Sequence, residues 1–102
     1  MKKTEEIKSI AKSTIEIEAK SILQLVDFVD DTFVRVVRKL LQNNGRLVIS
    51  GIGKSANIAQ KLVATFNSTG QPALFMHAAD AIHGDLGTIQ QDDVVICISK
   101  SG

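Results

Sequence analysis

The sequence predicts an α/β fold in which N-terminal helices precede a parallel sheet. Apolar residues recur at helical spacing over residues 7–41, with charged residues between them. Three short apolar runs follow at residues 46–50, 72–76 and 93–98, separated by a helical pattern and a connector. Strands that alternate with helices form parallel sheets through right-handed crossovers, so these observations favour helices packed on a parallel sheet.

The helical lead-in is expected to cover residues 1–44 and to contain two helices. Asp30-Asp31-Thr32 interrupts the apolar stripe with residues that favour N-cap positions. This interruption divides the lead-in into helices at about 4–28 and 31–42. Asn43-Asn44-Gly45 then provides a helix stop, so the β/α portion is expected to occupy residues 45–102.

The strands are expected at the three apolar runs. The run 46–50 leads into a glycine loop and then into a helical pattern that reaches Gly70. Residues 72–76 form the second strand, and residues 78–86 a helical or irregular connector. The third strand is expected at residues 93–98, and its unbroken apolar character from Val94 to Ile98 favours burial on both faces. A polar turn of the kind that opens another helix follows, so we expect the chain to stop inside the domain, after its third strand.

The composition is that of a globular domain without a strong charge excess. Hydrophobic residues make up 44% of the chain and charged residues 23%, which is too apolar for disorder. Lys and Arg number 12 against 11 Asp and Glu. Nucleic-acid binding normally needs a larger basic excess, so nucleic acid is not expected as a partner. No stretch approaches the roughly 20 apolar residues of a membrane span. We therefore expect no membrane association and a cytoplasmic location.

Cys97 is the single cysteine, which excludes an internal disulfide. It lies in the apolar run Val94-Val95-Ile96-Cys97-Ile98, where a small thiol is typically buried and inert. No CxxC motif or cluster of Cys and His indicates zinc. No metal and no other cofactor is expected.

The segment Gly51-Ile52-Gly53-Lys54-Ser55 lies between a predicted strand and a predicted helix. Glycines there let the backbone approach an anion, and the free N–H groups at the helix start attract it. Lys54 places a cation against the helix dipole, which favours a bound anion as its partner. The Ser55 hydroxyl can either cap the helix or bind a phosphate or sugar oxygen. The segment therefore predicts a phosphate or sugar site.

Two nucleotide-binding motifs compete for the same segment. A Walker A loop needs a glycine where this chain has Val48, and fails there. Gly51, Gly53 and Ala56 satisfy the dinucleotide fingerprint, but His77 stands where a carboxylate is expected after the second strand. Both motifs are therefore less favoured than a simple phosphate site.

Two further segments place polar groups at the same end of the predicted sheet. His83-Gly84-Asp85 sets an imidazole beside a carboxylate in the connector; an exposed loop histidine without a function is the alternative. His77, directly after the second strand, is expected to be a hydrogen-bonded cap on the following loop. Ser99-Lys100-Ser101-Gly102 offers two hydroxyls, a cation and a flexible backbone, which suit a phosphate monoester.

Together these motifs resemble the SIS phosphosugar-binding domain and, within it, the arabinose-5-phosphate isomerases of the KpsF/GutQ group. The resemblance covers essentially the whole chain. It rests on four runs: Gly51-Ile-Gly-Lys-Ser, Thr65-Phe-Asn-Ser-Thr-Gly, His83-Gly-Asp-Leu-Gly and Ser99-Lys-Ser-Gly. It implies a flavodoxin-like, three-layer αβα domain, of which residues 1–102 are the N-terminal portion.

The resemblance also implies a reaction and a set of site residues. The reaction interconverts D-arabinose 5-phosphate and D-ribulose 5-phosphate through an enediolate, and supplies Kdo for lipopolysaccharide. Catalytic roles are implied for Lys54 and His83, in an enzyme that works as a homo-oligomer. Asp80 stands where many relatives have Glu, which keeps the charge. The implied substrate-binding residues are Gly53, Ser55, Asp85, Ser99, Ser101 and Gly102.

Two other hypotheses remain open. The chain can be a non-catalytic sensor that binds a sugar phosphate through the same loops, or a truncated remnant that associates with itself. Lys54 and His83 favour the enzyme, because a sensor needs only the phosphate-binding turn.

Overall fold

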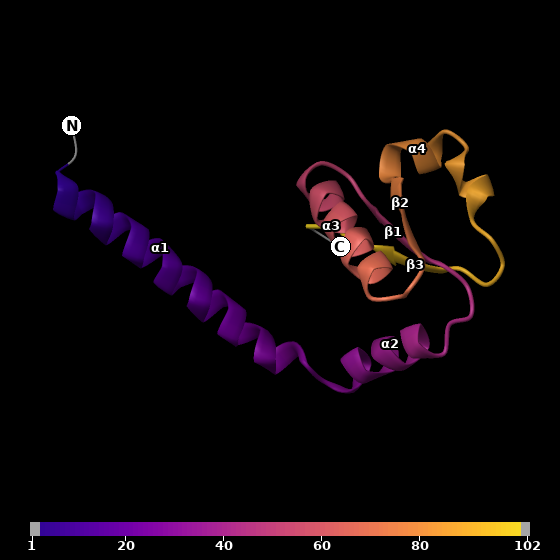
Figure 1. Cartoon of the computed structure of the whole chain (residues 1–102), viewed down its shortest axis with the longest axis horizontal. Helices are drawn as coiled ribbons and strands as arrows, with labels where there is room; N and C mark the ends of the chain where they lie inside the picture. The colour runs from indigo at the N-terminus through magenta and orange to yellow at the C-terminus, as the bar shows by residue number, and fades with distance from the viewer. Residues whose placement is uncertain (1–2, 101–102) are drawn as a thin grey trace. The chain divides into compact units, whose positions relative to one another are not determined.

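The structure, a computed structural model, describes residues 3–100 and divides into two compact units between Arg38 and Lys39. The first unit is helical (Figure 1). Helix α1 spans Thr4–Gln24 and tightens into the 3₁₀ helix η1, Leu25–Phe28. Helix α2, Asp31–Leu41, follows and crosses the boundary between the units. The predicted pair of lead-in helices is therefore confirmed, with the last turn of the first helix in 3₁₀ form.

The break between the two lead-in helices is capped as predicted. The Oδ1 atom of Asp30 accepts a hydrogen bond from the backbone N–H of Phe33 at 3.0 Å. This bond satisfies one of the N–H groups that a helix start leaves without a partner.

The second unit contains the predicted parallel sheet. In chain order it consists of strand β1 and helix α3, then strand β2 and the short helices α4 and η2, then strand β3. All pairings are parallel in the order β2-β1-β3, which places the first strand at the centre. The bounds are β1 Leu47–Gly51, α3 Lys54–Ser68, β2 Ala73–His77, α4 Ala78–Ile82, η2 Asp85–Thr88 and β3 Val94–Cys97.

The core forms where α3 covers one face of this sheet (Figure 1). All five residues of β1 are buried. Leu47 and Ile49 pack with Ala59 of α3 at the centre of the apolar cluster. Each fully buried aliphatic side chain of this kind contributes about 1.5–3 kcal/mol relative to exposure. Partly buried residues of α3 and the two outer strands complete the cluster: Leu62, Val63, Phe66, Ala73, Phe75, Val94 and Ile96.

The third strand differs from its prediction. Burial on both faces is wrong, because exposure alternates along β3 and Val95 is 43% exposed. The physical reason is the strand order: β3 is an outer strand, and Val95 and Cys97 are paired with Val48 and Ser50, on the face away from α3. Cys97 is exposed, so the prediction of a buried thiol is also wrong.

None of the helices within residues 3–100 is both long enough and apolar enough to cross a lipid bilayer.

Candidate functional site

The carboxyl ends of the three strands meet at one edge of the sheet, where they border a cavity of about 430 Å³. This edge is where open parallel sheets bind ligands. Its lining comes from the loops after all three strands. The lining residues are Ser50, Gly51, Ile52, Ser55, Ala78, Cys97, Ile98, Ser99 and Lys100.

The glycine loop connects strand β1 to helix α3, as the sequence predicted, and its glycines have structural reasons of their own. A Cβ on Gly51 would lie 2.9 Å from the backbone carbonyl carbon and oxygen of Ser55, so only glycine allows this close approach. Gly53 is the N-cap of α3 with φ +61°, a left-handed conformation that favours glycine. The loop thus turns sharply enough to aim the start of a 15-residue helix at the sheet edge.

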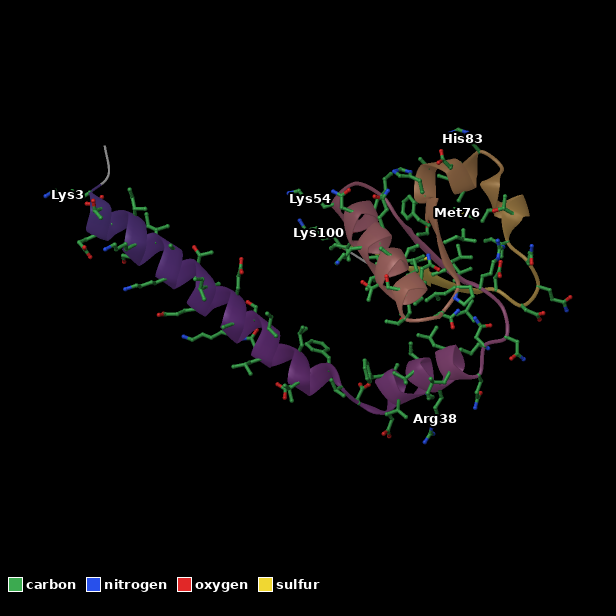
Figure 2. All side chains as sticks on the ribbon, in the orientation of Figure 1. Lys3, Arg38, Lys54, Met76, His83 and Lys100 are labelled. Carbon is green, nitrogen blue, oxygen red and sulfur yellow. The ribbon has the colours of Figure 1, made fainter. Side chains whose placement is uncertain are left out.

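Lys54 and Ser55 form the start of α3. The Lys54 side chain is exposed, and Figure 2 labels it at the beginning of the helix. The Ser55 side chain is half-buried and lines the cavity. The start of α3 therefore combines the Lys54 cation, the Ser55 hydroxyl and the free N–H groups of the first helical turn. These groups together suit a phosphate.

The turn after β3 contributes a second hydroxyl and a second cation. Ser99 and Lys100 are exposed and line the cavity beside Cys97. The predicted binding residues Ser101 and Gly102 lie outside the described residues. Among the described residues that line the cavity, Lys100 has the only charged side chain. The lining is therefore positively charged.

The connector after β2 carries His77 and His83. The predicted cap is confirmed, because His77 Nδ1 accepts a hydrogen bond from Ala79 N–H at 3.1 Å. His83 is the C-cap of α4 and is exposed (Figure 2). It is not among the residues that line the cavity. Asp85 opens η2, and its side chain lies outside what the structure describes. The structure thus brings Ser55 and Ser99 to one cavity and leaves His83 on a separate element.

Two lining residues with polar or reactive side chains were missed by the sequence analysis: Ser50 and Cys97. They are paired across β1 and β3, and both lie next to the carboxyl edge. Lys100, the cation of the predicted phosphate-binding turn, also lines the cavity.

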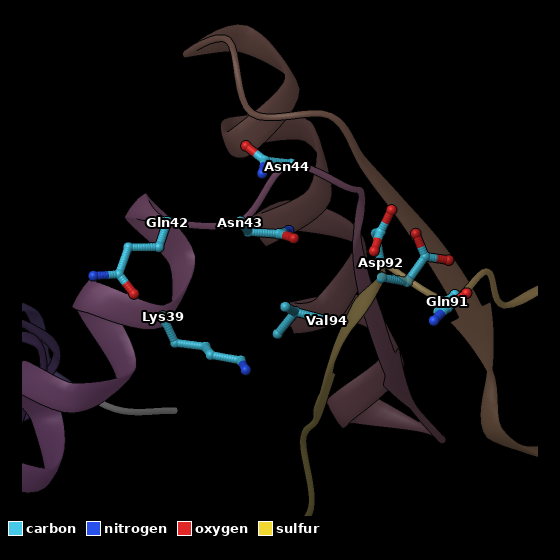
Figure 3. Close-up of a pocket in the computed structure, with 8 residues that line it drawn as sticks. Lys39, Gln42, Asn43, Asn44, Gln91, Asp92 and Val94 are labelled. Carbon is cyan, nitrogen blue, oxygen red and sulfur yellow. The ribbon is translucent and has the colours of Figure 1, made fainter.

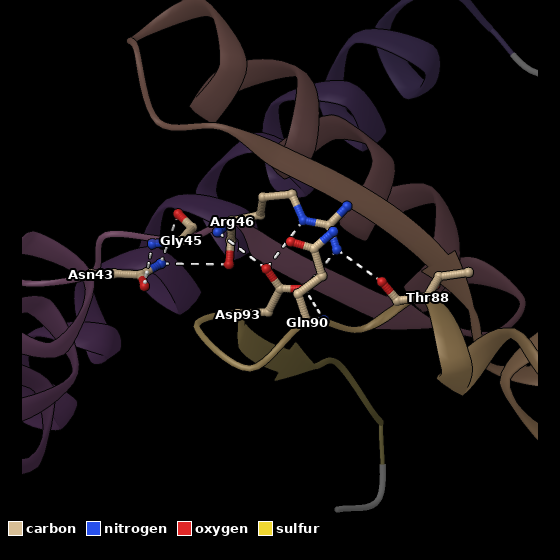
Figure 4. A network of polar contacts seen from close by, with 6 residues as sticks. All are labelled: Asn43, Gly45, Arg46, Thr88, Gln90 and Asp93. Carbon is tan, nitrogen blue, oxygen red and sulfur yellow. Dashed lines mark hydrogen bonds and ion pairs between the residues drawn. The ribbon is translucent and has the colours of Figure 1, made fainter.

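A second cavity, of about 350 Å³, lies at the opposite edge of the sheet (Figure 3). Its polar lining comes from the chain before β1 and before β3: Lys39, Gln42, Asn43, Asn44, Gln91, Asp92 and Asp93, with Val94. Hydrogen bonds connect the chain segments at this edge (Figure 4). Arg46 Nη2 donates to Asp93 Oδ2 at 2.7 Å and to Thr88 O at 2.9 Å. None of the predicted site residues that the structure describes lines this second cavity. The carboxyl edge is therefore the candidate functional site.

Among curated proteins, the chain is similar to enzymes named for one sugar phosphate. It is 47% identical over 93 residues to a probable arabinose 5-phosphate isomerase of Haemophilus influenzae, covering 91% of this chain and 28% of that protein. It is 42% identical over 99 residues to the arabinose 5-phosphate isomerase GutQ of Escherichia coli K12, covering 97% of this chain and 31% of that protein. The chain therefore spans about a third of the length of these relatives.

Two solved structures share the fold. One, from E. coli CFT073, was determined in complex with arabinose 5-phosphate; it has a TM-score of 0.90 and 39% identity, over 96% of this chain and 52% of that one. The other is a putative sugar-phosphate isomerase from Listeria monocytogenes, with a TM-score of 0.92 and 35% identity, over 100% of this chain and 54% of that one. The SIS domain family matches residues 39–102, more than half of the chain. With its parallel sheet and carboxyl-edge cavity, the chain belongs to the SIS domain family.

Proposed function

We propose that this chain is the sugar-phosphate-binding portion of an aldose–ketose isomerase that interconverts D-arabinose 5-phosphate and D-ribulose 5-phosphate. The observation that carries the proposal is the cavity at the carboxyl edge, lined by the hydroxyls of Ser55 and Ser99 and by the Lys100 cation. Relatives named for arabinose 5-phosphate support the choice of sugar.

In this proposal the phosphate is held at the two loops that line the cavity. The N-terminal N–H groups of α3, next to Gly53, attract a dianion, and the hydroxyls of Ser55 and Ser99 donate to its oxygens. Ser101 and Gly102, the next two residues in the sequence, are assigned to phosphate binding as well. A phosphate fixed at this point holds the sugar carbons in one position relative to the remaining groups.

The isomerisation moves one proton between neighbouring carbons. A base removes the proton from C2 of the aldose, which gives the enediolate, and the proton is then added to C1. The hydroxyl oxygen on C2 loses its proton and the oxygen on C1 gains one, which gives the ketose. Lys54 stabilises the negative charge that develops on the enediolate oxygen. His83 transfers a proton or binds the sugar hydroxyls, and Asp85 contacts the substrate.

The proposal extends to the setting of the reaction. The arabinose 5-phosphate formed would supply Kdo for lipopolysaccharide, in the cytoplasm, by an enzyme that is a homo-oligomer. The hydroxyl-lined cavity with its Lys100 cation supports this setting, because it suits a small charged metabolite.

The test is turnover of D-arabinose 5-phosphate to the ketose by this chain and by a form extended to the length of its relatives. Lys54→Ala should lower kcat by about 100-fold, as expected for loss of an oxyanion-stabilising group. Lys61→Ala removes another exposed lysine of α3 and should leave kcat unchanged. Unchanged turnover in the Lys54 variant would exclude its assigned role. Binding of arabinose 5-phosphate without turnover in either form would favour the sensor.

A further inference from the structure

His77 ends β2 at the carboxyl edge, and two contacts fix its ring. Phe75 meets it edge-on, with ring centroids 6.1 Å apart and planes at 82°. In addition, Nδ1 of the ring accepts the hydrogen bond from Ala79 N–H at 3.1 Å. The side chain is half-buried, and the register pairs His77 with Gly51 of the glycine loop. An apolar contact and a polar contact therefore both orient this imidazole.

The hydrogen bond fixes the chemical form of the ring. A histidine nitrogen accepts a hydrogen bond only when it carries no proton, so the proton of the neutral ring is on Nε2. The acceptor therefore satisfies one N–H of α4, as an Asn or Ser oxygen does at longer helices.

This bond matters because α4 is short. It contains five residues, Ala78–Ile82, and a helix this short is not stable by itself. At the other end of α4, the backbone N–H of the C-cap His83 donates to Asp80 O at 3.0 Å. The backbone of His83 is thus fixed by the helix that His77 starts. Among residues 3–100, no hydrogen bond to the His83 side chain holds its ring directly.

We propose that His77 is a positioning residue for His83, acting through the cap on α4. The inference rests on the proposed function, in which His83 acts near the sugar. In that role His77 touches no substrate; its Nδ1 acceptor determines whether α4 is formed, and α4 determines where the imidazole of His83 lies.

Two variants separate the acceptor from the bulk of the ring. His77→Leu keeps an apolar contact with Phe75 and removes the acceptor, whereas His77→Asn supplies a short oxygen acceptor of the kind that caps helices. The measurements are NMR amide exchange at Ala79 and His83 in the free chain, and the response of the His83 ring signals to D-arabinose 5-phosphate. The amides of Ile49 and Ser55 report on the core and on the phosphate loop.

We expect His77→Leu to speed exchange at Ala79 and His83 by about fivefold to thirtyfold, the effect of losing a helix cap. The His83 ring should then lose its response to the ligand, while Ser55 still responds and Ile49 exchanges as before. His77→Asn should restore both readouts to within about twofold of the original chain. Normal exchange at Ala79 and His83 in His77→Leu would overturn the proposal, and so would failure of His77→Asn to restore them.

A different result would contradict the proposed function. If neither Ser55 nor His83 responds to D-arabinose 5-phosphate in the unaltered chain, the substrate assignment is wrong. The exchange rates at Ala79 and His83 are measured without ligand. They therefore test whether His77 positions the backbone of His83, whatever the substrate is.

Discussion

The guanidinium of Arg46 donates to both carboxylate oxygens of Asp93, from Nε to Oδ1 at 3.1 Å and from Nη2 to Oδ2 at 2.7 Å (Figure 4). This pair joins the residue before β1 to the residue before β3. The Gln90 N–H also donates to Oδ2, at 2.7 Å, and the Asp93 side chain is 1% exposed. The hydrogen bond from Arg46, followed by the one from Gln90, lowers the pKa of Asp93 from 3.8 to about 2.

Asp93→Asn should destabilise the chain at neutral pH, and the difference should disappear in acid. A carboxyl whose pKa is lowered by folding contributes stability above its unfolded pKa, and this contribution is lost as the pH falls through the folded pKa. The free energies of unfolding of the two proteins in urea should therefore begin to converge below about pH 4 and meet near pH 2. Asp92→Asn, at the exposed neighbouring residue, should show little difference at any pH. A difference for Asp93→Asn that does not change with pH would contradict the ion-pair explanation.

Gly51→Ala should disrupt the glycine loop. The added methyl group would lie 2.9 Å from the Ser55 carbonyl, so either β1 or the first turn of α3 must shift. Such overpacking costs about 1–3 kcal/mol of the free energy of unfolding. Calorimetric titration with D-arabinose 5-phosphate should show weaker binding as well, because Ser55 moves. Gly87→Ala is the matched control, since a Cβ there meets nothing within 4 Å; equal effects in the two variants would contradict the role assigned to the close approach.

Cys97 should react with a maleimide in the folded chain. Its side chain is exposed and lines the carboxyl-edge cavity, so labelling is expected within about tenfold of the rate in urea. D-arabinose 5-phosphate should slow the labelling if it occupies that cavity. Cys97→Ser provides the unlabelled reference for mass spectrometry. Labelling that requires urea would show that the thiol is buried in solution.

Much of the fold was predictable because its signals are local. The spacing of apolar residues distinguishes the lead-in helices from the strands, and Asp30 marks the helix start that its side chain caps. The position of the glycine loop between a strand and a helix was predictable for the same reason. The close approach at Gly51 and the positive φ of Gly53 are visible only in the structure.

Burial of the third strand was not predictable from its own residues. An apolar run identifies a strand, but its exposure depends on which strands flank it, and that follows from the sheet order. The same limit applies to the site. The loops after the strands could be assigned to one edge, yet Ser50 and Cys97 could join the cavity lining only once the face covered by α3 was known.

The central position of β1 has a consequence for the order in which the chain folds. β1 is the first strand in the sequence, but Leu47 pairs with Ala73 and with Val94, both of which come much later. During synthesis, β1 therefore leaves the ribosome before either neighbour exists, and its buried Leu47, Val48 and Ile49 stay accessible until the third strand follows. Because such distant pairings are slow to form, sheet closure rather than helix formation should limit the folding rate.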